Sequence, residues 1–158
     1  MSGGALHVLE SHPFAAELRP EHRARLAAMA KEVHFAPNQV IFHEGDRYSV
    51  LYLLVEGMVA LELEVPDYVL RVQTLYAGDV FDWSAVLRHQ AKHFQARALD
   101  QVTALAVEGD DLLAAFASDP EFGNAFLLRL MGVVSERLRA TRLQLLDMYS
   151  PVAKRAGA

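Results

Sequence analysis

The sequence predicts a mainly β fold with flanking helices, in which a sandwich, barrel or jelly roll of short strands precedes a long C-terminal helix. The 158-residue length and the 53% apolar content suit one domain with a real core. Between about residues 31 and 107 the hydrophobic period is close to two, with turn dipeptides at short intervals. Beyond Gly109 the period becomes helical, and we expect a single domain over residues 1–158.

The composition excludes several classes of protein. With 15 Lys and Arg against 20 Asp and Glu, the formal charge is -5, so nucleic acids and anionic membranes would need a local basic patch, and none dominates. The absence of Cys excludes disulfides, thiolate catalysis and Cys-based metal sites. The longest apolar runs, such as residues 50–55, are far below the roughly 18 residues of a membrane span, and no signal-peptide pattern is present. We expect a cytoplasmic protein without a membrane partner.

The N-terminal helices are expected within residues 13–30. Pro20 stands at a favourable first helical position, and Glu21 follows where an acid suits the helix dipole. Apolar residues such as Leu26 and Met29 then recur in a charged, alanine-rich frame. These features predict a short helix that begins at about Pro20.

The β-roll is expected over residues 31–107. Turn dipeptides such as Glu56-Gly57 separate its apolar runs. In the run 58–65, Val and Leu alternate with residues that include Glu62 and Glu64, which predicts that both acids lie on a solvated face. The expected strands are Lys31–Ala36, Gln39–His43, Val50–Glu56, Met58–Val65, Tyr68–Tyr76, His93–Asp100 and Val102–Val107.

Two helices are expected after the roll: a short one over residues 109–117 and a long one over residues 119–149, with a tail over 150–158. About 30 residues correspond to about 45 Å of helix, longer than a domain of this size needs to cover a sheet. One apolar stripe, which includes Phe122 and Phe126, suits packing on a sheet.

A second stripe on the long helix steps by four and three in turn, as the seam of a left-handed helix pair does. The alternative is that both stripes form one wide core face. The helix length favours a partner, so we expect a homodimer through this seam. Its residues are Leu127, Met131, Val134, Leu138, Thr141, Leu145 and Met148.

With its helices and strands in this order, the sequence resembles the cyclic nucleotide-binding domain of the Crp/Fnr-type regulators over roughly residues 14–149. The segments that carry the resemblance are IFHEGD (residues 41–46), LYLLVEGMV (51–59) and LYAGDVF (75–81), in which glycines stand at the positive-φ turns of that family. The resemblance implies a double-stranded β-helix, or jelly roll, of cyclic nucleotide-binding type with a C-terminal dimerisation helix. It also implies a role in signal transduction.

In the family that the chain resembles, a Gly-Glu-Leu segment supplies a Glu to the ribose 2′-hydroxyl, and a later Arg pairs with the cyclic phosphate. Here Asp82, Trp83 and Ser84 stand in place of Gly-Glu-Leu. Lys92 stands at the Arg position, with His93 beside it, and Lys lacks the bidentate geometry of Arg. We therefore expect an unidentified small ligand and weak or no binding of cyclic AMP.

An anionic ligand would use the charge of Lys92, a donor from His93 and backbone amides from Trp83 to Ala85. Asp82 would repel a phosphate, unless it caps the following helix or pairs with Lys92 and closes the site.

Two further residues have alternative interpretations. Trp83 either stacks on a base or plugs the pocket. Thr141 resembles the position from which some family dimers contact the adenine of the partner subunit, whereas the simpler interpretation is a polar seam residue that sets helix register.

The first functional prediction is a non-enzymatic regulatory module with this diverged pocket, acting as a homodimer or through a protein partner. The main alternative is a ligand-free structural or adaptor dimer whose pocket is plugged by Trp83. A cupin-like metal-dependent enzyme is a more distant alternative, because the His-x-His of cupins does not occur and His89 with His93 is a weak ligand pair. DNA contact is not expected, because residues 151–158 are too few for a recognition helix.

Overall fold

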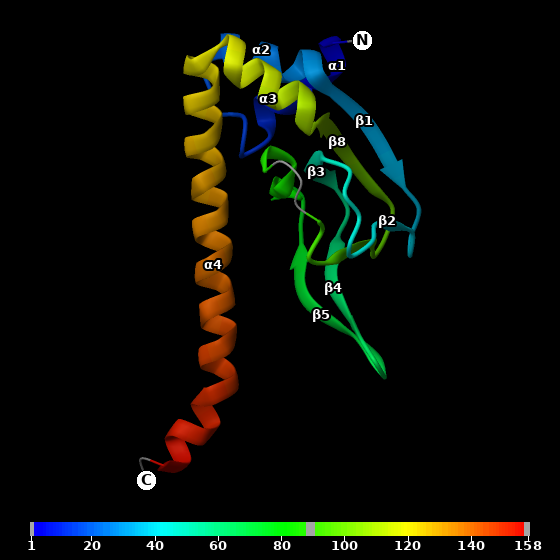
Figure 1. Cartoon of the computed structure of the whole chain (residues 1–158), viewed down its shortest axis with the longest axis vertical. Helices are drawn as coiled ribbons and strands as arrows, with labels where there is room; N and C mark the ends of the chain where they lie inside the picture. Colours follow the sequence, from blue (N-terminus) through cyan, green and yellow to red (C-terminus); the bar gives the residue numbers. More distant parts are fainter. Residues whose placement is uncertain (1, 88–90, 157–158) are drawn as a thin grey trace.

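The computed structural model describes residues 2–87 and 91–156 and shows a β-roll with helices at one end and a long helix along one side (Figure 1). The prediction of a mainly β fold with flanking helices is confirmed. The strands are β1 Ala30–Phe35, β2 Val40–Phe42, β3 Val50–Glu56, β4 Val59–Val65, β5 Tyr68–Leu75, β6 Val80–Phe81, β7 Gln95–Ala98 and β8 Val102–Glu108. The helices are α1 Ser2–Ser11, α2 Pro20–Met29, the 3₁₀ turn η1 Trp83–Val86, α3 Gly109–Ser118 and α4 Pro120–Ala156.

The strands form two four-stranded antiparallel sheets, with the orders β1-β8-β3-β6 and β2-β7-β4-β5. One core cluster lies between the sheets, since it joins Tyr52 and Leu54 of the first sheet to Leu61 and Leu75 of the second. A second cluster joins the first sheet to the helices, and it contains Phe14, Leu26, Phe122 and Phe126. The roll is therefore closed at its helical end by α1, α2, α3 and the start of α4.

Glycine occupies the left-handed turn positions that the sequence indicated. Gly45, Gly57 and Gly78 have φ values of 89°, 91° and 97°. At Gly57, a Cβ atom would lie 2.4 Å from the backbone oxygen of Gln101, so the turn between β3 and β4 requires glycine for space as well as for φ.

The structure differs from the sequence expectation at both ends of the chain. Helix α1 was missed, and residues 13–17 form a turn instead of the start of the N-terminal helices. The helix α4 spans 37 residues, about 56 Å at 1.5 Å per residue, and continues through most of the segment expected to be a tail. Within residues 2–87 and 91–156, no helix combines the length and the apolar character that crossing a bilayer requires.

The turn after α1 is held by two buried interactions. Nε2 of His12 lies 3.0 Å from the carbonyl oxygen of Leu54, and its Nδ1 accepts the amide hydrogen of Phe14. From α4, Arg129 donates to the carbonyl oxygens of Pro13 and Phe14. The first turns of α4 are thereby fixed to the N-terminal segment, and the rest of the helix extends from that anchor.

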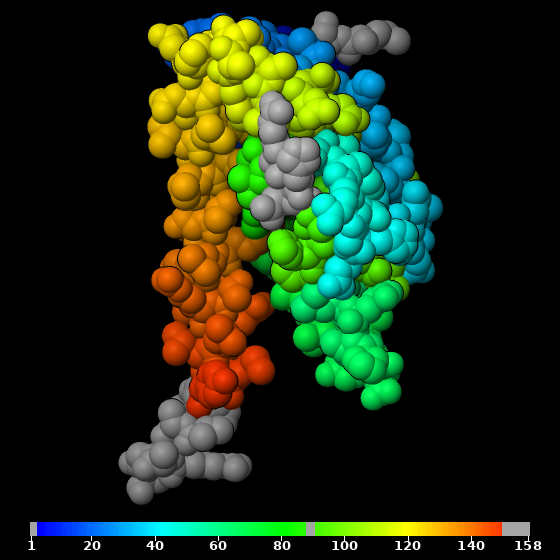
Figure 2. Space-filling view, viewed as in Figure 1, coloured from blue at the N-terminus to red at the C-terminus, as the bar shows by residue number. Residues whose placement is uncertain are grey.

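Beyond the roll, the lower half of α4 stands apart from the hairpin of β4 and β5 (Figure 2). Large apolar side chains are exposed along most of α4, both beside the roll and in this lower half. Those exposed from Leu127 onward are Leu127, Leu128, Met131, Leu138, Leu143, Leu145, Leu146, Met148 and Tyr149.

Candidate ligand pocket

A cavity of about 350 Å³ lies between the roll and α4. The sheet side contributes Phe42 of β2, Leu61 of β4 and two residues of β5. The lining residues are Phe42, Leu61, Val72, Gln73, Asp82, Trp83, Ser84, Lys92, His93, Phe94, Val134, Arg137, Leu138 and Thr141. The cavity thus brings together six of the seven residues that the sequence suggested for the pocket.

Asp82 and Lys92 form an ion pair in the wall of this cavity. Asp82 directly follows β6 in the left-handed region, with φ 64°, and its Oδ1 accepts a hydrogen bond of 2.8 Å from Ser84. Its Oδ2 accepts a hydrogen bond from the Nζ atom of Lys92. Both side chains are only 2% exposed.

Two aromatic rings also lie close to the Lys92 ammonium group. Its Nζ atom lies 5.2 Å from the ring centroid of Phe42 and 5.3 Å from that of Tyr48. Burial raises the pKa of Asp82, and the hydrogen bond and charge of Lys92, with the hydrogen bond from Ser84, oppose this in part. The positive charge of Lys92 therefore already has a carboxyl partner inside the protein.

Trp83 and Arg137 meet where the cavity wall passes from η1 to α4. The Cζ atom of Arg137 lies 4.5 Å from the centroid of the Trp83 ring, and its Nη2 donates to the carbonyl oxygen of Val80 at 2.9 Å. Burial lowers the pKa of Arg137, against the charge of Asp79. Trp83 forms part of the wall and also packs against the helical core.

The family profile described as "Cyclic nucleotide-binding domain" matches residues 32–119, which is more than half of the chain. The chain belongs to the cyclic nucleotide-binding domain family. The match covers the roll, the segment that carries Asp82 and Lys92, and the short helix α3. The jelly-roll type predicted from the sequence is thereby confirmed.

Individual relatives in this family agree with the assignment. The chain is 25% identical over 132 residues to a CRP-like cAMP-activated global transcriptional regulator of Mycobacterium tuberculosis, covering 83% of this chain and 57% of the regulator. The chain thus spans a little over half the length of that relative. The fold matches the N-terminal domain of a Streptomyces coelicolor A3(2) transcriptional regulator with a TM-score of 0.68 and 30% identity, covering 88% of this chain and 95% of that one. A Geobacter metallireducens GS-15 protein described as cyclic nucleotide-binding matches with a TM-score of 0.75 and 25% identity, covering 85% and 98%.

At the position of the Gly-Glu-Leu segment of the cyclic nucleotide-binding family, this chain places a short 3₁₀ turn. Ala85 does not reach the cavity: it is buried in the helical core, and its amide donates to the carbonyl oxygen of Asp82 at 3.1 Å. Asp82 makes no side-chain cap to this turn. The amide of Ala85, one of those expected in an anion cradle, is therefore already occupied.

His93 and Thr141 lie at the exposed part of the lining. The hydroxyl group of Thr141 donates to the carbonyl oxygen of Arg137 at 3.0 Å, one turn back along α4. His89, considered with His93 as a metal-ligand pair, lies outside the described residues. In the described part of the chain, no three His, Asp or Glu side chains are grouped to hold a metal ion.

Two arginines of α4 have roles that the sequence pattern did not indicate. Arg129 anchors α4 to the N-terminal turn, and Arg137 lines the cavity. The periodicity of α4 alone placed both among the charged residues of the helix. What distinguishes them from the solvated residues of α4 is how the helix packs against the roll, and a local sequence pattern does not reveal that packing.

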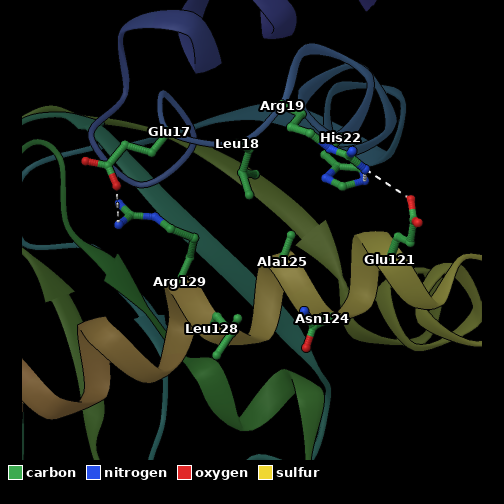
Figure 3. A pocket seen from close by; sticks show the side chains of 9 residues that line it. All are labelled: Glu17, Leu18, Arg19, His22, Glu121, Asn124, Ala125, Leu128 and Arg129. Carbon is green, nitrogen blue, oxygen red and sulfur yellow. Dashed lines mark hydrogen bonds and ion pairs between the residues drawn. The ribbon is translucent and has the colours of Figure 1, made fainter.

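Arg129 also borders a second hollow of about 490 Å³, between the N-terminal segment and the start of α4 (Figure 3). There it donates to Glu17 at 2.9 Å, and Arg19 donates to Glu121 at 3.1 Å. These pairs link the two segments across the hollow, so its charged groups already have partners in the protein.

The prediction of a solvated position is wrong for Glu62. Instead of lying on a solvated face, it is 2% exposed, and it accepts hydrogen bonds from Arg97 and from Gln95, the latter at 3.0 Å. Burial by itself raises the pKa of Glu62, but the hydrogen bonds from Arg97 and Gln95, with the charges of Arg97 and Arg71, lower it overall. This cluster pairs β4 with β7 beside the pocket.

Proposed function

We propose that this chain is a non-enzymatic regulatory module that binds a small ligand in a pocket diverged from cyclic nucleotide recognition. The observation that carries the proposal is a cavity of about 350 Å³, of a size suited to a small molecule, whose anion position is occupied by Asp82 paired with Lys92. The module keeps the family's site and changes its chemistry.

Cyclic AMP fits this chemistry poorly. A cyclic phosphate beside Lys92 would face the Asp82 carboxyl group, and separating the buried pair would leave one charge without a partner. Trp83 stands where the family supplies a carboxylate to the ribose, so the 2′-hydroxyl loses that acceptor. Both changes weaken cyclic nucleotide binding.

The output of the module is proposed to pass through α4 in a homodimer, or to a protein partner. Val134, Leu138 and Thr141 belong both to the cavity wall and to the heptad-like stripe of α4. Leu127 and Leu145, at other positions of the stripe, are 43% and 48% exposed. A ligand that fills the cavity therefore touches the same helix that offers the seam.

A ligand-free adaptor is the second candidate function. The observation that favours it is the closed Asp82–Lys92 pair, which is satisfied without a ligand. The remaining cavity favours the ligand-binding module, since a plugged pocket would have Trp83 filling that volume.

A thermal-shift screen separates the two candidates. Its compounds are cyclic mononucleotides, cyclic dinucleotides, haem, divalent metals and small carboxylates with their amides. Val72→Trp fills the cavity from β5, and Val69→Trp adds the same bulk at an exposed position of that strand. A ligand at a hundredfold excess over its Kd adds about 2.7 kcal/mol of stability, which raises Tm by roughly 5–10 °C at this size.

The ligand-binding module predicts at least one compound that stabilises the wild type and Val69→Trp but not Val72→Trp. If every compound leaves all three proteins unchanged, or stabilises Val72→Trp equally, the adaptor function replaces it.

A further inference from the structure

Arg137 lines the ligand cavity, and the described residues accept a hydrogen bond from one of its donors. A guanidinium group has five N–H donors. Nη2 donates one hydrogen bond to the carbonyl oxygen of Val80, and the Cζ atom lies 4.5 Å from the centroid of the Trp83 ring. Within residues 2–87 and 91–156, no other acceptor is hydrogen-bonded to this group, and no carboxylate oxygen lies within 4.0 Å of its nitrogens.

Lys92, whose ammonium group also lies in the lining, offers fewer free donors to a ligand than Arg137. Its ammonium group is paired with Asp82 and lies against the rings of Phe42 and Tyr48. A ligand anion at Lys92 would compete with a carboxyl group that is already in place. Arg137 is therefore the residue of the lining with which a negatively charged ligand group would interact most favourably.

Asp79 is the acid whose charge acts on Arg137, but it does not form an ion pair with the guanidinium group. Asp79 contributes an attractive charge, but its Oδ2 accepts the amide hydrogen of Tyr76 at 2.8 Å. Arg137 is half-buried and remains charged. Because no carboxylate of the described residues pairs with this partly buried charge, a ligand that brings its own negative charge into the site would stabilise it.

The remaining part of the lining is mainly apolar. Phe94 and four aliphatic side chains supply this apolar surface. Such a surface suits the hydrocarbon part of an organic molecule better than a hydrated phosphate. The apolar lining residues other than the aromatic ones are Leu61, Val72, Val134 and Leu138.

We propose that the ligand is a small organic carboxylate whose apolar body fills this cavity and whose carboxylate is bound by the guanidinium group of Arg137. This rests on the proposed function, because it names the ligand class of that pocket. A carboxylate presents two oxygens in a plane, which matches two parallel N–H donors of a guanidinium group. The apolar body takes its binding free energy from the surface that it removes from water.

The probes for the test are 3-phenylpropionate and its amide, 3-phenylpropanamide, which share one body and differ in charge. Trp83 is the single Trp of the chain, so its fluorescence reports on the cavity wall, and calorimetry gives the same affinities independently. In the wild type, we expect the acid to bind roughly tenfold or more tightly than the amide, the effect of a charge-assisted hydrogen bond.

Three variants test whether Arg137 causes the preference for the acid over the amide. Arg137→Gln is expected to abolish the difference between acid and amide, and Arg137→Lys to retain only part of it. Arg139→Gln removes the same charge from an exposed position of α4 and should keep the full difference. Retention in Arg139→Gln with loss in Arg137→Gln supports the proposal.

Equal binding of acid and amide by the wild type overturns the carboxylate class, as does an acid preference that survives in Arg137→Gln. Failure of both probes to bind overturns it as well. In each case the proposed function stands if another compound of the screen stabilises the wild type and not Val72→Trp, so the two failures are distinguishable.

Discussion

Arg137 of the long helix lies over the indole ring of Trp83, with its Cζ atom 4.5 Å from the ring centroid. The same guanidinium group donates to the carbonyl oxygen of Val80, at the start of β6. Trp83 directly follows Asp82, the acid of the buried ion pair. One side chain of α4 is therefore attached to the segment that forms the pocket wall, and a displacement of that segment reaches the helix directly.

Replacing Arg137 by Ala should loosen α4 from the roll. The loss of the contact with Trp83 and of one hydrogen bond is expected to lower the free energy of unfolding by about 1–3 kcal/mol. Hydrogen exchange should become faster in α4 around residues 134–141, while Arg139→Ala should leave that segment unchanged. Unaltered exchange in Arg137→Ala would show that the contact does not hold the helix.

The Asp82–Lys92 pair should behave as a unit. Asp82→Asn or Lys92→Met alone leaves a buried charge without its partner and is expected to cost about 3–5 kcal/mol. Asn is the suitable replacement because it tolerates the positive φ of this position. The double variant should recover much of the loss, since neither charge remains.

Chemical denaturation of the four proteins gives the coupling free energy of the pair. A double variant whose loss equals the sum of the single losses contradicts the assignment of a coupled pair.

The pH dependence of stability should contain a contribution from His12. Burial lowers the pKa of His12 from its usual 6.5, against the hydrogen bond to Leu54 and the charge of Asp79. Below about pH 6.5 the unfolded chain therefore binds a proton that the folded chain does not, and stability falls as the pH drops. The contribution is at most about 1.4 kcal/mol for each pH unit below 6.5.

The measurement is the free energy of unfolding at pH 7.5 and pH 5.5 for the wild type and for His12→Gln. The wild type should lose more stability on acidification than the variant, and this difference removes the contributions of other groups. His7→Gln, at an exposed position of α1, should follow the wild type. Identical losses in the wild type and His12→Gln would refute the assignment to His12.

The seam on α4 predicts a homodimer, and part of this seam lies outside the ligand cavity. Leu127 and Leu145 are exposed and do not line the cavity, so Leu127→Glu with Leu145→Glu disrupts the seam alone. Light scattering should find a dimer for the wild type at micromolar concentration and a monomer for the variant, because the charges would be desolvated in the seam. A monomeric wild type would rule out the seam as a dimer interface.

The order of elements was predictable because short-range signals determine it. Turn glycines, the change of hydrophobic period and proline at the start of a helix are each visible within a few residues. Strand β6 was missed because two residues cannot show a period. Helix α1 was missed because its glycines and polar residues give a weak helical pattern, and its apolar residues are stabilised by packing on the core.

The residues of the candidate site could be predicted where a local sequence motif locates them, but not where tertiary packing does. Asp82, Trp83 and Lys92 could be located by counting along a family motif, and their pairing had been one of two alternatives. The position of Arg137 depends on how α4 lies against the roll. Burial of Glu62 depends on Arg97 and Gln95 of a strand more than 30 residues away.

The central claim is that the pocket belongs to the cyclic nucleotide-binding family but no longer recognises the family's ligand, because Asp82 occupies the partner position of Lys92. The most direct test is a titration of the wild-type protein with cyclic AMP, followed by calorimetry and by the fluorescence of Trp83. The account predicts no saturable binding below about 1 mM, which corresponds to a binding free energy weaker than about -4 kcal/mol. Saturation at micromolar cyclic AMP, with a change in Trp83 fluorescence, would contradict it.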